Sequence, residues 1–113
     1  MGQSEEVREQ LVALREQKDA RAARIEAELD ALTRARRSES DDDEHDPEGV
    51  TLSSQWSMLA GLLASAREDA RAAEAAVQRF DAGDYGICTA CGQPIPEGQL
   101  EARPFRERCV ACS

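Results

Sequence analysis

Four cysteines near the end of the chain are the residues best suited to chemistry. They form two C-x2-C pairs, Cys88 with Cys91 and Cys109 with Cys112, and 17 residues separate the pairs. This spacing is typical of a zinc site with four thiolate ligands. Each pair presents two sulfur atoms from a tight turn, and Gly92 suits the backbone that leaves such a turn. Because four sulfur ligands leave no position for water or substrate, we expect one structural Zn2+ and no catalytic metal.

Iron in the same four-thiolate shell is the main alternative to zinc, and two disulfides are a further one. Disulfides persist in oxidising compartments. Residues 1–15, however, are rich in Glu and Arg and contain no apolar stretch of the kind found in a signal peptide. We therefore expect a cytoplasmic protein with reduced thiols. A thioredoxin-like redox role is disfavoured, since it uses a single C-x-x-C beside a βαβ pattern.

The cysteine-bearing segment has little apolar material with which to fold alone. Its candidate core residues are Ile87, Ile95, Leu100, Phe105 and Val110. Zinc affinities worth roughly 10–16 kcal/mol in small fingers would therefore supply most of the free energy of folding.

The composition excludes several classes of protein. Of the 113 residues, 41% are hydrophobic but only 4% are aromatic, so the chain must be elongated, stabilised by metal, or both. The net charge is −9, and residues 38–50 hold seven acidic side chains and no basic one. This charge argues against binding to nucleic acid through bulk electrostatics, which needs a basic surface. No apolar run approaches the roughly 20 residues that span a membrane.

Two long helices are predicted ahead of the cysteines. Residues 5–37 lack Gly and Pro and are dominated by strong helix formers, with apolar residues at helical spacing. Residues 38–49, which are acidic and include Pro47 and Gly49, are expected to break this pattern. A second helix should begin at Thr51 or Ser53 and run to about residues 80–82, where Gly83 ends it. Its apolar positions alternate in steps of four and three, as in a coiled coil: Leu52, Trp56, Leu59, Leu63, Ala66, Ala70, Ala73, Val77 and Phe80.

Two apolar stripes of similar length on either side of a short connection favour an antiparallel hairpin. We therefore predict a mostly α fold with two domains. These are an antiparallel coiled-coil hairpin over residues 1–83, with an acidic tip at 38–50, and a four-cysteine zinc finger over residues 84–113. A monomer is expected because the hairpin satisfies its own seam, and a homodimer through the heptads is the alternative.

The acidic tip has two interpretations from its residues alone. Its carboxylates are the ligands that Mg2+ or Ca2+ prefers, but the run lacks the D-x-[DN]-x-[DN]-G-x5-E pattern of a calcium loop. The other interpretation is a solvated run of charge that keeps the tip soluble. His45 has no second His or Cys near it in sequence and is expected to be an exposed loop residue.

The finger region resembles the DksA/TraR family. Residues 85–96 read YGICTACGQPIP, and residues 100–105 read LEARPF ahead of the second cysteine pair. The family has a Y-G-x-C-x-x-C-G-x-x-I stretch and then an L-x-A-x-P stretch at these places. It also carries a coiled-coil hairpin with acidic residues at its tip, so the resemblance extends more loosely over the preceding helices.

The resemblance implies a transcription regulator that binds RNA polymerase without contacting promoter DNA specifically. Family members enter through the secondary channel of the polymerase, and the hairpin tip reaches toward the catalytic Mg2+. The corresponding partner-binding residues here would be Asp42, Asp43 and Asp46. The family tip reads D-x-x-D-x-A, whereas this chain has D-x-x-D at residues 43–46 and Glu48 in place of Ala.

The alternative function is a zinc-stabilised module that binds a different protein and has a passive, solvated tip. An enzyme is not expected, because the chain has no Ser/His/Asp or Cys/His constellation and its single His lies far from the cysteines in sequence.

Overall fold

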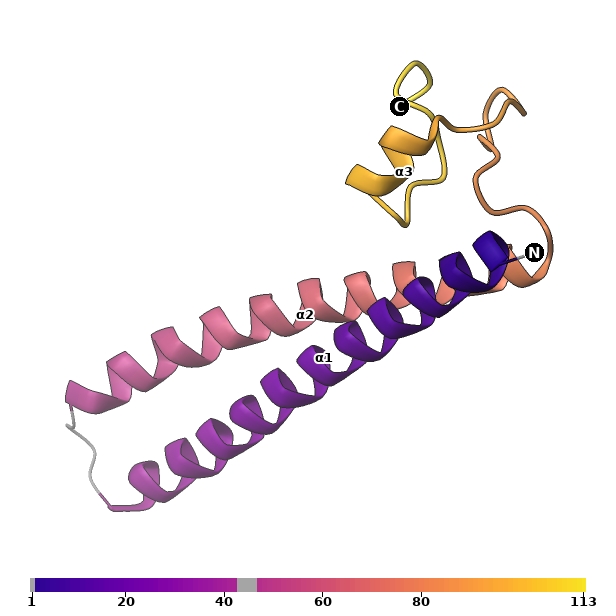
Figure 1. Ribbon diagram of the computed structural model, residues 1–113. Helices are drawn as coiled ribbons and strands as arrows, with labels where there is room; N and C mark the ends of the chain where they lie inside the picture. The colour runs from indigo at the N-terminus through magenta and orange to yellow at the C-terminus, as the bar shows by residue number, and fades with distance from the viewer. Residues whose placement is uncertain (1, 43–46) are drawn as a thin grey trace. The chain divides into compact units, whose positions relative to one another are not determined.

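The protein is mostly helical. The computed structural model describes the backbone of residues 2–42 and 47–113, and the side chains of residues 4–38 and 52–113. These parts contain three helices, α1 (Gly2–Asp42), α2 (Pro47–Asp81) and α3 (Glu97–Ala102) (Figure 1). They contain no strand beyond one isolated antiparallel bridge between Ile87 and Pro94. The predicted fold class is confirmed, and none of the described helices has the length and apolar character needed to cross a membrane.

The helices on either side of the acidic segment are longer than predicted. α1 continues to Asp42, and α2 begins at Pro47, so the expectation that residues 38–49 break the helical pattern was wrong for most of them. Ser, Glu and Asp cost only about 0.5 kcal/mol each in a helix relative to Ala, too little to stop one. Proline suits the first position of a helix, where its missing N–H has no partner to lose. Pro47 therefore starts α2 and does not interrupt it.

The end of α2 is fixed by Gly83, as predicted. Gly83 has φ of +83°, and its N–H donates to the carbonyl of Phe80 at 3.0 Å. The N–H of Asp84 donates to the carbonyl of Arg79 at 2.8 Å. This pair of bonds is a Schellman motif, in which a left-handed glycine satisfies the last carbonyls of the helix. The chain is thereby turned out of α2 and into the cysteine-bearing segment.

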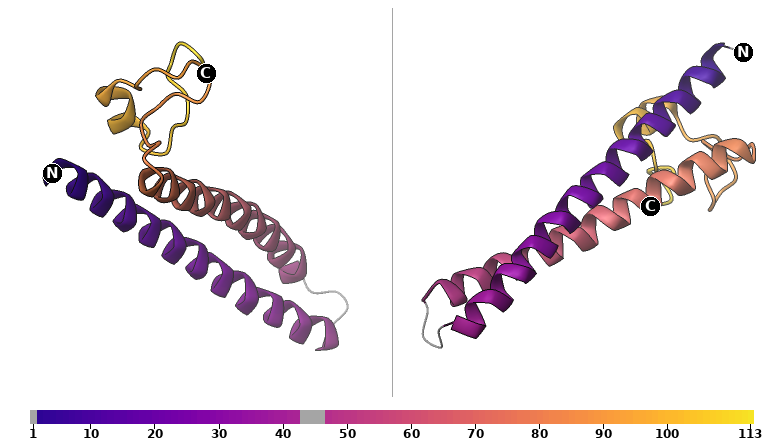
Figure 2. Two further views of the ribbon diagram at one scale, coloured as in Figure 1. Left: turned by 90° about the vertical axis from the view of Figure 1, so that its right-hand side faces the viewer. Right: turned by 90° about the horizontal axis from the view of Figure 1, so that it is seen from below.

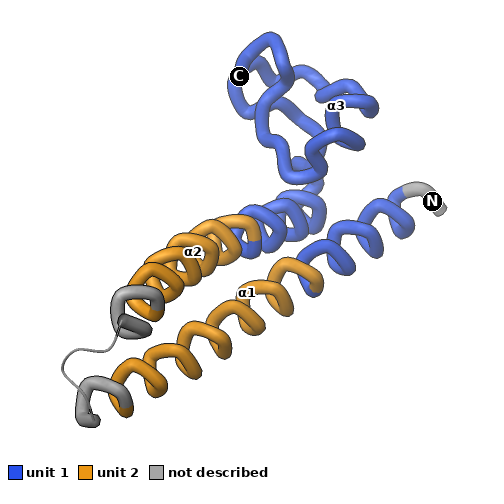
Figure 3. Tube along the Cα trace, turned by 90° about the vertical axis from the view of Figure 1, so that its left-hand side faces the viewer, with its two compact units in different colours: residues 1–16, 70–113 blue, residues 17–69 orange. Residues whose placement is uncertain are grey.

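The chain divides into two compact units (Figure 3). Unit 2 comprises residues 17–69, and in it a part of α1 lies beside a part of α2 (Figures 1 and 2). Its core contains Ala22 and Ile25 from α1 and Leu63 and Ala66 from α2, with the partly buried Leu29 and Leu59 packed against it. The two parts run antiparallel, since later residues of α1 meet earlier residues of α2.

Trp56 anchors a second group of contacts in unit 2. Its indole Nε1 donates to Thr33 Oγ1 at 2.9 Å, and the Thr33 hydroxyl donates to the carbonyl of Leu29 at 2.8 Å. The guanidinium of Arg36 lies 5.7 Å from the Trp56 ring centroid and donates to Ser53 Oγ at 3.1 Å. The half-buried indole thus has both an apolar face and a satisfied N–H, as amphipathic aromatics usually do.

Unit 1 comprises residues 1–16 and 70–113. Its core is formed by Leu11, Ala76 and Val77, with Val7, Val12, Phe80, Tyr85 and Phe105 packed against it. Two ion pairs flank the helices: Arg8 lies 2.8 Å from Asp81, and Arg15 lies 3.1 Å from Glu74. The predicted division into a hairpin domain of residues 1–83 and a finger domain of residues 84–113 stays a prediction.

The predicted seam of α2 describes most of its buried face. Ala66, Ala73 and Val77 are at most 3% exposed, and Leu63 is 6% exposed. The seam omitted Ala76, which is fully buried. Alanine carries a weak hydrophobic signal, so a buried alanine beside the seam is hard to tell from an exposed one by periodicity.

Candidate metal centre

The first cysteine pair lies in a small turn of backbone that the single bridge holds in shape. The N–H of Cys88 donates to the carbonyl of Gln93 at 2.9 Å, and the N–H of Gly92 donates back to the Cys88 carbonyl at 2.9 Å. Gly92 has φ of +74°, which confirms the expectation that glycine suits this exit. The N–H of Cys91 points to the Cys88 sulfur at 3.5 Å. Cys88 itself is buried.

The second pair lies in a tight turn at the end of the chain. The N–H groups of Cys112 and Ser113 both donate to the carbonyl of Cys109, at 3.0 and 3.1 Å. Gln99 of α3 accepts the N–H of Val110 through its side chain at 2.9 Å, which ties this turn to α3.

One backbone hydrogen bond joins the two turns. The N–H of Thr89 donates to the carbonyl of Glu107 at 2.9 Å. Because Thr89 follows the first cysteine of one pair and Glu107 precedes the other pair, this bond holds the two cysteine turns against each other.

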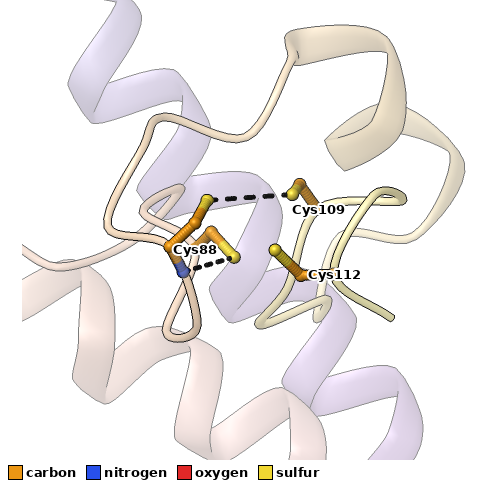
Figure 4. A group of neighbouring side chains, drawn as sticks. Cys88, Cys109 and Cys112 are labelled. Atoms are coloured by element: carbon orange, nitrogen blue, oxygen red, sulfur yellow. Dashed lines mark hydrogen bonds between the residues drawn. The ribbon is translucent and has the colours of Figure 1, made fainter.

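The four sulfur atoms of Cys88, Cys91, Cys109 and Cys112 all lie within 4.8 Å of one another. Figure 4 shows the labelled Cys88, Cys109 and Cys112 side chains directed toward a common centre. Sulfurs at 2.3 Å from a tetrahedral zinc ion are about 3.8 Å apart, and Cys91 Sγ and Cys109 Sγ are separated by 4.0 Å. The donor set and its spacing therefore fit a divalent metal with four thiolate ligands.

Comparison with known families agrees with this geometry. Residues 83–112 match the family model described as the prokaryotic dksA/traR C4-type zinc finger. This segment is thus similar to a zinc finger of the DksA/TraR C4 type. In a finger of this type, the four clustered cysteines are consistent with one structural zinc ion.

Curated relatives match a similarly short part of the chain. The chain is 41% identical over 39 residues to the RNA polymerase-binding transcription factor DksA of Haemophilus influenzae, covering 34% of this chain and 27% of that protein. It is 42% identical over 38 residues to an uncharacterized protein of Aquifex aeolicus, covering 34% of this chain and 26% of that one. The match therefore spans only about a quarter of the length of these curated relatives.

A solved structure extends the likeness to the whole fold. The structure of transcription factor DksA2 from Pseudomonas aeruginosa superimposes with a TM-score of 0.82 and covers 99% of this chain and 81% of that chain. Sequence identity is 23%, so this likeness concerns the fold.

The surroundings of the four cysteines shift the pKa values of two of their thiols in opposite directions. Backbone hydrogen bonds, chiefly from Cys109 and then Cys91, lower the pKa of the Cys88 thiol to about 6. Hydrogen bonds with the neighbouring cysteine side chains, chiefly Cys109, raise the pKa of the Cys112 thiol to about 12. Thiols this close do not all ionise without a cation among them, and a divalent metal held by the four sulfurs would supply one.

One side chain of α2 attaches the finger to that helix and another ties the finger together, and sequence analysis predicted neither contact. Arg79 donates to Glu107 Oε1 at 3.0 Å and to the carbonyl of Phe105 at 3.2 Å. Tyr85 donates its hydroxyl proton to the carbonyl of Pro104 at 2.9 Å, and burial raises the pKa of that hydroxyl. The partners in these bonds lie 19 to 28 residues apart in the chain, so no local sequence pattern predicts the contacts.

The predicted core of the finger was partly wrong. Ile95 is buried, and Leu100 and Phe105 are partly buried, but Ile87 is 41% exposed and Val110 is 57% exposed. Both exposed residues stand next to a cysteine in the chain. Since the turn directs the cysteine side chain inward, its neighbour is left facing solvent.

The predicted tip residues, Asp42, Asp43 and Asp46, are not part of the cysteine site. Asp42 is the last residue of α1, and its side chain is not among those described. Asp43, His45 and Asp46 lie outside the described residues. Their role stays a prediction.

Proposed function

We propose that this protein binds RNA polymerase and regulates transcription. The observation that carries the proposal is the combination of a DksA/TraR-type finger with the fold of a DksA transcription factor over nearly the whole chain. A curated relative that matches about a third of the chain is itself an RNA polymerase-binding transcription factor. The proposed partner is thus a protein, and no sequence-specific contact with nucleic acid or contact with a membrane is required. Such a protein works in the cytoplasm, as a binding factor and not as an enzyme.

In this proposal Cys88, Cys91, Cys109 and Cys112 are the four ligands of one zinc ion. Bound zinc supplies free energy of folding and no chemistry on a substrate, because a complete shell of thiolates leaves no open position. The residues of the chain position the finger. Arg79, near the end of α2, holds it through the carbonyl of Phe105, and Tyr85 joins two parts of the finger through the carbonyl of Pro104. The metal would keep the two cysteine turns together, and the contacts of Arg79 keep the finger on α2.

The hairpin would act at its acidic end. Asp42, Asp43 and Asp46 belong to the segment that holds seven of the acidic residues and no base. Inserted through the secondary channel of the polymerase, this segment would approach a site that contains metal. An acidic probe is attracted to a positively charged channel, and its charge acts most strongly where water is scarce. The hairpin of residues 1–83 and the finger of residues 84–113 would serve as the two functional parts of a monomer.

Fluorescence anisotropy of the zinc-loaded protein with core RNA polymerase, paired with transcription in vitro, tests the proposal. The tip variant carries Asp43→Ala and Asp46→Ala. A matched control carries Asp19→Ala and Asp30→Ala, because both aspartates are exposed on α1 and neither joins a salt bridge with the described residues.

We expect all three proteins to bind, with the effect on transcription lost in the tip variant alone. Absence of binding by the unaltered protein at micromolar concentration would refute the polymerase proposal. Equal effects of all three proteins on transcription would instead assign the tip a passive role, as in the alternative of a zinc-stabilised interaction module.

A further inference from the structure

Unit 1 contains a cleft that the proposed function does not use. Its volume is about 430 Å³, and its two walls are formed by one face of α1 and by the finger around α3. Both walls belong to the same compact unit (Figure 3). The lining residues are Glu6, Val7, Gln10, Leu11, Leu14, Tyr85, Glu97, Leu100, Glu101 and Pro104.

The floor of the cleft is apolar and has helical spacing. Val7, Leu11 and Leu14 follow one another at i, i+4 and i+7 on α1, and Leu100 and Pro104 face them from the finger. Leu11 is part of the buried core, while Val7, Leu14 and Leu100 are only partly buried. Because Val7 and Leu11 also pack in the core of unit 1 with Ala76 and Val77, the surface left for a second helix is the exposed part of this stripe at Val7 and Leu14.

The rim of the cleft carries three carboxylates, Glu6, Glu97 and Glu101, and no basic residue lines it. All three side chains are exposed. None of them takes part in a salt bridge or a side-chain hydrogen bond that the structure records among its described residues, whereas Asp69, Glu74, Asp81 and Glu107 each meet an arginine. The cleft therefore presents an apolar floor under a rim of uncompensated negative charge.

We propose that this cleft binds an amphipathic helix of a protein partner whose apolar side chains are flanked by arginine or lysine. The apolar side chains would cover Val7, Leu14 and Leu100, and the basic ones would reach the three glutamates. Helix-in-groove recognition combines such apolar anchors with complementary charge at the edge. A volume of about 430 Å³ suits a few anchoring side chains and falls within the ordinary range for binding clefts. The inference goes beyond the proposed function, because it holds for any protein partner with this chemistry.

The test uses the full, zinc-loaded chain and a synthetic helical peptide of about 16 residues, long enough to be partly helical alone. The peptide carries leucines at i, i+4 and i+7 with arginines beside them, and a second peptide has glutamates in place of the arginines. Binding is followed by anisotropy and by changes in the NMR spectrum of the protein. Spermidine serves as a probe for simple attraction of cations.

Two triple variants distinguish binding in the cleft from a general attraction of the basic peptide to acidic side chains. One carries Glu6→Gln, Glu97→Gln and Glu101→Gln. The other removes the same charge from exposed positions of α1 that do not line the cleft, through Glu5→Gln, Glu9→Gln and Glu16→Gln. Circular dichroism and zinc content confirm that both variants fold. A third variant, with Glu97→Lys and Glu101→Lys, tests whether the preference for the basic peptide over the glutamate peptide can be reversed.

We expect the basic peptide to bind in the micromolar range and to shift the resonances of Val7, Leu14 and Leu100. Its dissociation constant should rise about tenfold in the cleft variant and stay nearly unchanged in the control, since three rim pairs each contribute modestly. The lysine variant should prefer the glutamate peptide. Equal weakening in both triple variants, shifts confined to other surfaces, competition by spermidine at equal concentration, or no binding would each overturn the proposal.

Discussion

Replacement of Leu63 by alanine should test the core of unit 2 most directly. Leu63 is 6% exposed and packs with Ala22, Ile25 and Ala66. Truncation to alanine removes three carbon atoms from this cluster, at about 0.8 kcal/mol each. The seam between two helices is open along its sides, so the added cost of a cavity should be small. We expect a total loss of about 2–3 kcal/mol, in the lower half of the usual range for such a change.

The adjacent residue provides a matched control. Leu62 lies on the same helix but is 40% exposed, so Leu62→Ala removes the same atoms from a site already in contact with water. Leucine and alanine have nearly equal helix propensities, so neither change alters the helix itself by more than about 0.2 kcal/mol. The loss at this position should stay below about 1 kcal/mol.

Thermal unfolding of zinc-loaded protein by far-UV circular dichroism distinguishes the two variants. For a chain of this size, Leu63→Ala should lower the midpoint by about 8–15 °C and Leu62→Ala by less than about 4 °C. Equal shifts in the two variants, or a shift in Leu63→Ala below about 4 °C, would refute the packing derived for this cluster.

Three further predictions concern other parts of the molecule. Gly61→Ala should raise the free energy of unfolding by about 0.5–1 kcal/mol, because an added Cβ meets nothing within 4 Å and the residue is helical; a chemical denaturation curve shifted to lower denaturant would contradict this. Removal of zinc by a chelator should collapse the NMR dispersion of residues 85–113 while most helical circular dichroism remains, and a dispersed finger without metal would contradict the role given to zinc. A hydrogen bond from Arg8 lowers the pKa of Asp81 below 3.8, so this pair stabilises the protein above pH 3.8 and the contribution disappears as the pH falls through the lowered pKa. Carboxyl NMR titration should place the Asp81 midpoint below 3.8 and Arg8→Gln should raise it, whereas equal midpoints would show that the ion pair does not form in solution.

The parts of the fold that could be predicted from sequence depend on residues close together in the chain. The spacing of the cysteines indicated a common metal centre. Gly83 indicated the end of α2, because a left-handed glycine allows its own N–H and the next one to bond to carbonyls of the last turn. The four-three pattern of α2 identified its buried face because one face of a helix recurs at that interval. The beginning of α2 was mispredicted because proline was treated as a breaker at a position where it favours helix.

Other features depend on residues that come together only when the chain has folded. Contacts between segments distant in sequence produce the exposure of Ile87 and Val110, the attachment of the finger through Arg79, the bond of Tyr85 within the finger and the acidic cleft. Hydrophobicity alone could not say which apolar residues of the finger are covered, since the turns that direct the cysteines inward decide which neighbours face outward. Sequence by itself thus determined that two long helices form, most of the buried face of α2 and the pairing of the four cysteines as candidate ligands, because spacing and periodicity are local. Tertiary structure alone decided which surfaces remain open for a partner, because burial depends on the packing of the whole unit.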